Sequence, residues 1–387
     1  MNQVNKIKIY LSIVAISFIQ GLQYFCSPVL GQISAYYPDV NVSYVQMLVT
    51  VPTFLSIVVA LTSGYLVVKI TKKQMLIFAG AVAGITGLLP LAVDSFWLLF
   101  VCRALFGIAL GLATALNTAV VADFFEGDER VTAMGIQAAS VGAGMTVATY
   151  LGGLLGSFGF KTAYFVNLIG FISMIVLFLC LPETGLPKSE GENTKTKITV
   201  TPKVWMYAVM ITVECLFLIA FSTNIGMHVE GRFAESTKVA GYLTSAFSAS
   251  QIFIGIVLGA ISKVTKKFTI SAAYFSFVIG GIILVAFPDS LPMLLIGAIF
   301  CGFSQGMFIP TAMVGASNAV EPIATAMAAA IVTCGMCFGQ VISPMVLNAI
   351  SGAVFGSVST DGVYKICIVG MLLATVVSAV VLKKDKE

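Results

Sequence analysis

The chain has 387 residues, of which 58% are apolar and 10% are charged, and a formal net charge of +4. Soluble proteins carry about 25% charged residues, so a water-soluble domain of this size would lack the polar surface it needs. The composition therefore excludes an ordinary soluble protein and indicates a chain that lies in a lipid bilayer.

Long apolar runs follow one another along the chain, separated by short polar connections. A helix needs roughly 20 apolar residues to cross the hydrocarbon core, where its backbone must satisfy its own hydrogen bonds. The runs do not alternate polar and apolar residues as barrel strands would, so we expect an all-α membrane protein. Twelve transmembrane helices are expected, over residues 7–30, 44–68, 74–93, 95–122, 132–156, 161–181, 204–227, 239–262, 268–288, 290–316, 323–350 and 363–382.

Basic residues divide unevenly between the two sides of the membrane. With both termini inside, sixteen lysine and arginine residues fall in the inner segments and four in the outer loops. Short loops rich in Lys and Arg stay in the cytoplasm. The sequence therefore predicts cytoplasmic termini and a multi-pass protein of the cell (cytoplasmic) membrane. Because the net positive charge reflects this asymmetry, we expect no nucleic-acid partner.

One long polar segment, residues 183–203, interrupts the apolar runs and has the Pro, Gly, Ser and mixed charge of a flexible linker. It divides the expected helices into an N-terminal six-helix bundle, residues 1–182, and a C-terminal six-helix bundle, residues 204–387. All other connections are short, so no soluble enzymatic domain is expected.

Short motifs recur at corresponding places in the two halves. The segment KITKK at 69–73 returns as KVTKK at 263–267, and TAM at 132–134 returns at 325–327. Internal repeats of this kind are typical of membrane transporters whose halves are related by an axis normal to the membrane. We therefore expect two pseudo-symmetric bundles.

Two ionisable residues, Arg103 and Glu214, lie deep within expected spans. Such residues are costly in lipid and are functional by default. Glu214 is the candidate proton carrier because desolvation disfavours the charged form of a carboxyl group. Arg103 would reset it if the two residues approached in one conformation and separated in another. The alternative is a permanent ion pair that fixes the packing of the halves.

Several segments resemble the signatures of the major facilitator superfamily. The loop after the second expected span is similar to that family's loop of Gly, an Asp-Arg pair and basic residues, with Val68 at the Asp position. At the fifth span, Thr149 stands where the family's antiporter signature has Pro. The matching positions are Gly64, Lys69, Lys72 and Lys73 in the loop, Arg103 with Gly107 and Gly111, and then Asp123 and Arg130.

The resemblance implies the fold of that family and a central cavity lined by the first, fourth, seventh and tenth spans, among others. It also implies that Gly64, Lys69, Lys73, Asp123 and Arg130 belong to a loop that controls conformation. Polar side chains at the depth of the cavity are the candidate substrate contacts, although each has the alternative of an ordinary bond between helices. They are Gln20, Gln23, Tyr24, Asn117, Asn224, Gln251, Gln305 and Gln340.

The expected function is that of a secondary transporter which moves a small organic solute by alternating access and is coupled to protons. The alternatives are a drug or amphipath efflux antiporter, and an uncoupled facilitator or uniporter for a small organic anion. We expect no enzymatic activity, no cofactor and no metal, since the chain has one histidine and no visible catalytic cluster. The expected partners are the solute, protons and the bilayer, with the monomer as the functional unit.

Overall fold

A computed structural model describes residues 3–183, 201–321 and 324–384. Within these residues the chain forms fourteen α-helices, five short 3-10 helices (η) and no strand. In chain order the elements are α1 Gln3–Gly21, η1 Leu22–Tyr24, η2 Ser27–Val29, α2 Leu30–Tyr36, α3 Val42–Leu66, α4 Lys72–Leu88, η3 Leu89–Leu91, α5 Phe96–Phe124, α6 Gly127–Gly156, α7 Phe160–Ala163, η4 Tyr164–Asn167, α8 Leu168–Cys180, α9 Pro202–His228, α10 Ser236–Thr265, η5 Lys266–Phe268, α11 Thr269–Ala286, α12 Leu291–Ser317, α13 Thr325–Phe355 and α14 Thr360–Lys384.

In the part of the chain that is described, eleven helical segments are long and apolar enough to cross a membrane. The longest, Ser236–Ala286, has 51 residues and contains α10, η5 and α11. Its regular course is interrupted at Lys266, whose φ is 50°. The expected all-helical membrane protein is confirmed at this level.

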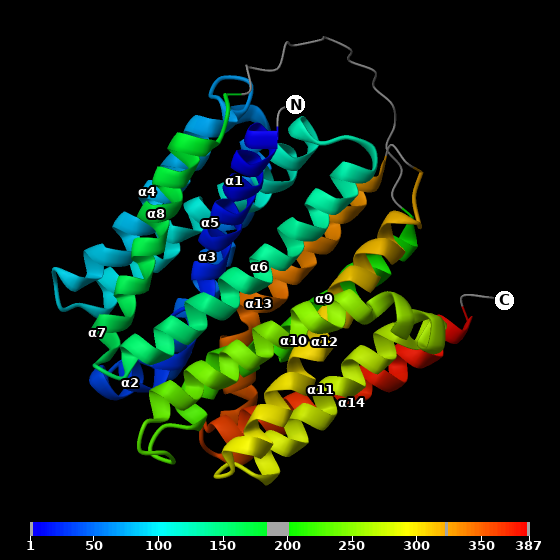
Figure 1. Ribbon diagram of the computed structural model, residues 1–387. Coiled ribbons are helices and arrows are strands. Elements are labelled where there is room, and N and C mark those ends of the chain that lie inside the picture. Colours follow the sequence, from blue (N-terminus) through cyan, green and yellow to red (C-terminus); the bar gives the residue numbers. More distant parts are fainter. Residues whose placement is uncertain (1–2, 184–200, 322–323, 385–387) are drawn as a thin grey trace.

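Buried apolar side chains form two separate clusters. One consists of residues from α1 to Leu181, with Ile219 added, and the other of residues from Val204 to Leu382. The same pairs of helices pack in each half: α3 on α5 as α10 on α12, α1 on α6 as α9 on α13, and α4 on α8 as α11 on α14. Figure 1 shows the last two pairs at opposite outer edges of the molecule.

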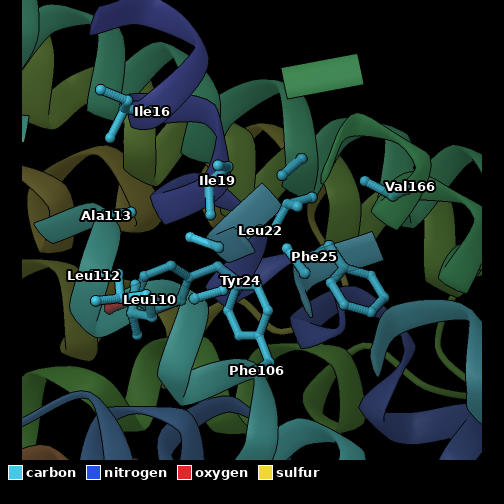
Figure 2. Packing of buried hydrophobic residues seen from close by; sticks show 14 of the residues in the cluster. Ile16, Ile19, Leu22, Tyr24, Phe25, Phe106, Leu110, Leu112, Ala113 and Val166 are labelled. Atoms are coloured by element: carbon cyan, nitrogen blue, oxygen red, sulfur yellow. The ribbon is translucent and has the colours of Figure 1, made fainter. Parts of the chain in front are cut away.

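The first long helix is broken near its middle. α1 ends at Gly21, where an added Cβ would lie 2.3 Å from the carbonyl carbon of Gly144, so only glycine permits this approach to α6. The chain continues through η1 and η2 before α2 resumes. Figure 2 shows Leu22, Tyr24 and Phe25 of this break near Phe106 and Leu110 of α5. The break brings the polar side chains that follow Gly21 toward the centre of the molecule.

One end of the molecule, the closed end, contains the connections at residues 37–41, 157–159, 229–235 and 356–359. There the two halves touch through backbone, because a Cβ on Gly153 would lie 2.5 Å from the Cα of Gly241. Buried amides add hydrogen bonds: Gln46 donates to Asn224 at 2.7 Å and accepts from Asn348 at 2.7 Å. These contacts join α3, α9 and α13 across the halves.

At the opposite end, the open end, α6 and α10 separate. A Cβ added to Gly142 would still meet Ile252 at 2.3 Å. Nearer the open end, an added Cβ on Gly135, Gly255 or Gly259 would meet nothing within 4 Å. The halves therefore enclose a space that narrows toward the closed end.

A cluster of polar and aromatic side chains ties the closed end of the first half together. Asp94, in the connection before α5, accepts hydrogen bonds from Tyr36 and from Tyr37 and pairs with Lys161 at 3.0 Å. These three contacts stabilise the carboxylate and lower the pKa of Asp94 to about 2. The connection is thus fixed to α2 and α7.

Candidate functional site

A cavity of about 520 Å³ lies between the two halves. Its walls come from α1, η1, α3, α5 and α6 on one side and from α10, α12 and α13 on the other. Six of the eight predicted substrate contacts line it: Gln20, Gln23, Tyr24, Gln251, Gln305 and Gln340. Of the four spans expected to line the cavity, the first, fourth and tenth do so, whereas α9, the seventh, supplies none of its lining residues.

Some amide side chains of the cavity wall form hydrogen bonds to neighbouring helices, whereas others have unused hydrogen-bonding groups. Gln20 donates to the carbonyl of Ala113 at 3.1 Å. Gln23 donates to the hydroxyl of Thr53 at 2.9 Å, and that hydroxyl lies 3.4 Å from the carbonyl oxygen of the Gln340 side chain. This short chain of hydrogen bonds crosses from η1 through α3 to α13 and joins the two halves beside the cavity.

Gln251 and Gln305 have more hydrogen-bonding capacity left. The Gln251 amide nitrogen is buried and has no partner among the described residues. Gln305 is only 8% exposed and borders the same space. Both side chains also border a second cavity of about 460 Å³ between α6, α10 and α12, the side cavity. The two amides are therefore polar groups shared by two cavities whose linings are largely apolar.

Asn117 and Asn224 lie outside the cavity. Asn117 is fully buried and donates to the hydroxyl of Ser17 at 3.0 Å, which joins α5 to α1. Asn224 belongs to the amide contacts of the closed end, where it accepts from Gln46. For these two residues the structure shows the alternative role, an ordinary bond between helices.

Arg103 donates hydrogen bonds to backbone carbonyl groups in its own half of the molecule. Pro52 has no N–H, so the carbonyl of Leu48, four residues earlier in α3, loses its helical donor, and Arg103 donates to it at 2.8 Å. The guanidinium also donates to the carbonyls of Leu22 and Gln23 just after α1 ends. The side chain is 2% exposed, so it stabilises the break in α1 without reaching the cavity.

The Arg103 guanidinium also lies against two aromatic rings, with its central carbon 5.2 Å from the ring centre of Phe25 and 5.1 Å from that of Phe106. The ion pairs formed by the described residues include none between Arg103 and Glu214. The permanent pair considered from the sequence is thus absent from this conformation.

Glu214 is completely buried in α9, one layer behind the cavity wall. One carboxyl oxygen accepts from the thiol of Cys215 at 3.3 Å, and the other has no partner among the described residues. Cys337 and Gln340 line the cavity near Cys215. Cys215 therefore lies between the carboxyl group and the cavity wall.

The residues of the signature loop lie at the open end. Gly64 is in the last turn of α3, Lys69 is exposed in the connection before α4, and the Lys73 ammonium lies 5.7 Å from the ring centre of Phe178. Asp123 pairs with Lys72 at 2.6 Å, which ties the start of α4 to the end of α5. Arg130 is exposed near the start of α6.

Sequence reasoning missed the polar face of α3. Gln46, Thr50, Thr53 and Ser56 are all buried, and they are spaced by three or four residues along one side of the helix. Thr53 and Ser56 line the cavity, and Gln46 holds the closed end. That spacing is visible in the sequence and was the signal available for them. Groups of three or more metal-ligating side chains are absent from the described part of the chain.

Comparisons with known proteins agree with this architecture. The model of the Major Facilitator Superfamily matches residues 13–234 and 229–387. The class D tetracycline resistance protein of Salmonella ordonez is 24% identical over 216 residues, which are 54% of this chain and 54% of that protein, so the match spans about half of each.

Two groups of solved structures share the fold. A crystal structure of the nucleoside transporter NupG superimposes with a TM-score of 0.77 and 12% identity, covering 96% of this chain and 98% of that one. A bacterial homolog of the human lysosomal transporter Spinster, in an inward-facing and unoccupied conformation, gives a TM-score of 0.69 and 15% identity. That match covers 99% of this chain and 95% of the other, and at these identities the likeness concerns the fold alone.

Proposed function

This chain belongs to the Major Facilitator Superfamily, and on that premise we propose that it is a proton-coupled secondary transporter of a small organic solute, working by alternating access. The observation that carries the proposal is the cavity between the halves, bounded by a closed end and an open end. A binding site at the interface of two repeats is the arrangement that such transporters use.

The finer topology is part of this proposal. Counting α10 and α11 as separate spans gives twelve, and the two apolar clusters support bundles over residues 1–182 and 204–387. An unbroken helix of 51 residues would be about 77 Å long, more than twice the hydrocarbon thickness. The linker proposed over 183–203 lies mostly outside the described residues, and its last two residues, Pro202 and Lys203, belong to α9 in the structure. The basic loops support an orientation with the open end and both termini in the cytoplasm, and the proposal includes a monomer in the cell membrane.

Proton coupling is assigned to Glu214. In this conformation its carboxyl group has no cationic partner among the described residues, and a charge there would be buried without compensation. We infer that Glu214 holds its proton while the open end is open and releases it when the halves rearrange. The thiol of Cys215 and the cavity residue Gln340 support an exchange path between the carboxyl group and the cavity.

We predict that Gln46→Leu destabilises the closed end. The substitution removes two hydrogen bonds and leaves the amides of Asn224 and Asn348 buried with fewer partners. Such a loss costs about 1–3 kcal/mol, so the equilibrium should shift by a factor of about 5–150 toward the conformation in which the closed end opens. Pulsed electron spin resonance distances between labels at Asp39 and Asp289, in a cysteine-free background, measure this shift.

Gln74→Leu is the matched control, because Gln74 is exposed at the start of α4, at the open end of the molecule. It should leave the distance distribution as in the parent protein. An unchanged distribution in Gln46→Leu as well would contradict the role given to these amides.

Direction of transport separates the main alternatives. The tetracycline resistance relative favours efflux, whereas the substrate cavity itself suits either direction. Proteoliposomes with a pH gradient imposed in each polarity decide between them: a symporter accumulates its solute on the alkaline side, an antiporter on the acidic side, and an uncoupled facilitator on neither. Solute flux that ignores both gradients would overturn proton coupling.

A further inference from the structure

We propose that the transported solute is an uncharged amphipathic molecule whose polar part binds Gln251 and Gln305 and whose apolar part occupies the side cavity. This inference rests on the proposed function, because it assigns the cargo of the same site. It narrows the class of solute, and it selects against the organic anion that the sequence left open.

The first argument is the absence of charge from the cavity wall. Among the described residues, those that line the central cavity and the side cavity include no Asp, Glu, Lys, Arg or His. The guanidinium of Arg103 is bound to three carbonyls of its own half, and the carboxyl group of Glu214 lies behind Cys215. A charged solute would lose its hydration here without gaining a counter-charge.

The second argument is the unused hydrogen-bonding capacity of the wall. A glutamine amide has two N–H donors and a carbonyl acceptor, and a buried amide left without a partner is unfavourable. The buried nitrogen of Gln251 has no partner among the described residues, and Gln305 lies on the same wall. A hydroxyl, carbonyl or amide group of the solute satisfies these groups without carrying charge.

The third argument is the shape and lining of the side cavity. Its wall between the two glutamines and the open end consists of small and aliphatic residues, among them Gly135, Ala139, Ile252, Gly255, Ile256 and Ile309. Ile256 is 77% exposed, and neither Gly135 nor Gly255 has a neighbour within 4 Å of an added Cβ. This is space for an apolar group directly beside the two amides.

The test is a binding screen by thermal shift on the full-length protein in lipid nanodiscs. The probes are matched sets that share one naphthyl group and differ in the attached group: an uncharged sugar, a sulfonate or a trimethylammonium. Free glucose serves as the polar compound without an apolar part. We expect stabilisation by uncharged amphipaths and an affinity lower by about tenfold or more for their charged counterparts, equivalent to one lost hydrogen bond or more. Stabilisation mainly by charged compounds, or by no uncharged amphipath, overturns the proposal.

Two pairs of variants locate the site. Gln305→Glu should lower the affinity for the uncharged compounds about tenfold and raise the affinity for the trimethylammonium compound. Gln74→Glu, at an exposed position, should change neither affinity. Gly255→Phe fills the side cavity and should weaken binding more as the apolar group grows, while Gly255→Ala should retain it. Equal binding by Gly255→Phe and the parent protein would show that the apolar group lies elsewhere and would overturn the assignment.

Binding and transport are measured separately, so the two proposals fail in different ways. A compound that binds as expected but is never moved in proteoliposomes contradicts the proposed function and leaves the assignment of the site intact. A compound that is moved with a pH gradient but carries a net charge contradicts this inference alone.

Discussion

Glu214→Gln should abolish accumulation of the solute driven by a pH gradient while retaining exchange of solute without a gradient. A difference of one pH unit is worth about 1.4 kcal/mol per proton, so coupling to one proton supports a concentration ratio of about ten. Glutamine keeps the shape of the side chain and cannot carry a proton, so the ratio in the variant should fall to about one. Accumulation ratios and counterflow rates in proteoliposomes, with a cargo found by the binding screen, measure both quantities.

Glu235→Gln makes the same substitution at an exposed position at the closed end, where Glu235 contacts Lys238. This control should accumulate solute like the parent protein. If Glu214→Gln also accumulated solute to the parent ratio, the carboxyl group would not be the proton carrier. Loss of both accumulation and counterflow would indicate a structural role instead.

Arg103→Ala should have the largest effect on stability. The substitution removes the guanidinium donor from the carbonyls of Leu22, Gln23 and Leu48 in a buried region, leaves Leu48 only a long contact from the Cys26 thiol, and costs about 1–3 kcal/mol for each unsatisfied carbonyl. We therefore expect a loss of at least about 3 kcal/mol, seen as a lower melting temperature in detergent and a lower yield of folded protein. Arg103→Lys should recover only part of this loss, because one ammonium cannot reproduce the fork of the guanidinium.

Arg130→Ala is the comparison for that experiment, because Arg130 is exposed near the start of α6. Its melting temperature should stay close to that of the parent protein. If Arg103→Ala melted like Arg130→Ala but failed to transport, Arg103 would act on the solute or on coupling. The structural role derived from the break in α1 would then be wrong.

The helical membrane fold could be predicted from the sequence because hydropathy and loop charge act over whole segments of about 20 residues. The break in α1 could not, since Gly21 is an ordinary residue of a membrane helix until its neighbour Gly144 is known. Pro52 indicated that the Leu48 carbonyl would lack a helical donor. That Arg103 supplies one follows only from the packing of α5 on α3.

For the candidate site, the sequence likewise predicts only part of the structure: the depth of a side chain along its helix, but not the direction in which it points. Depth along a helix follows from residue number, so the six lining residues could be chosen from the sequence. The direction in which a side chain points depends on the rotation of its helix in the bundle. Asn117 lies at the predicted depth but turns toward Ser17 of α1. Gln20 and Glu214 are 194 residues apart, the same offset that separates KITKK from KVTKK, yet Gln20 borders the cavity and Glu214 does not.

The closed end also determines how this protein responds to its surroundings. Its described residues join the halves by backbone contact and by neutral hydrogen bonds, as between Gln46 and Asn224, and form no ion pair across that interface. Salt screens charged contacts, and the membrane voltage does work only on charge. The contacts that hold the closed end together should therefore change little with ionic strength or membrane voltage, which act instead on charges elsewhere in the protein, such as the proton that Glu214 is proposed to release.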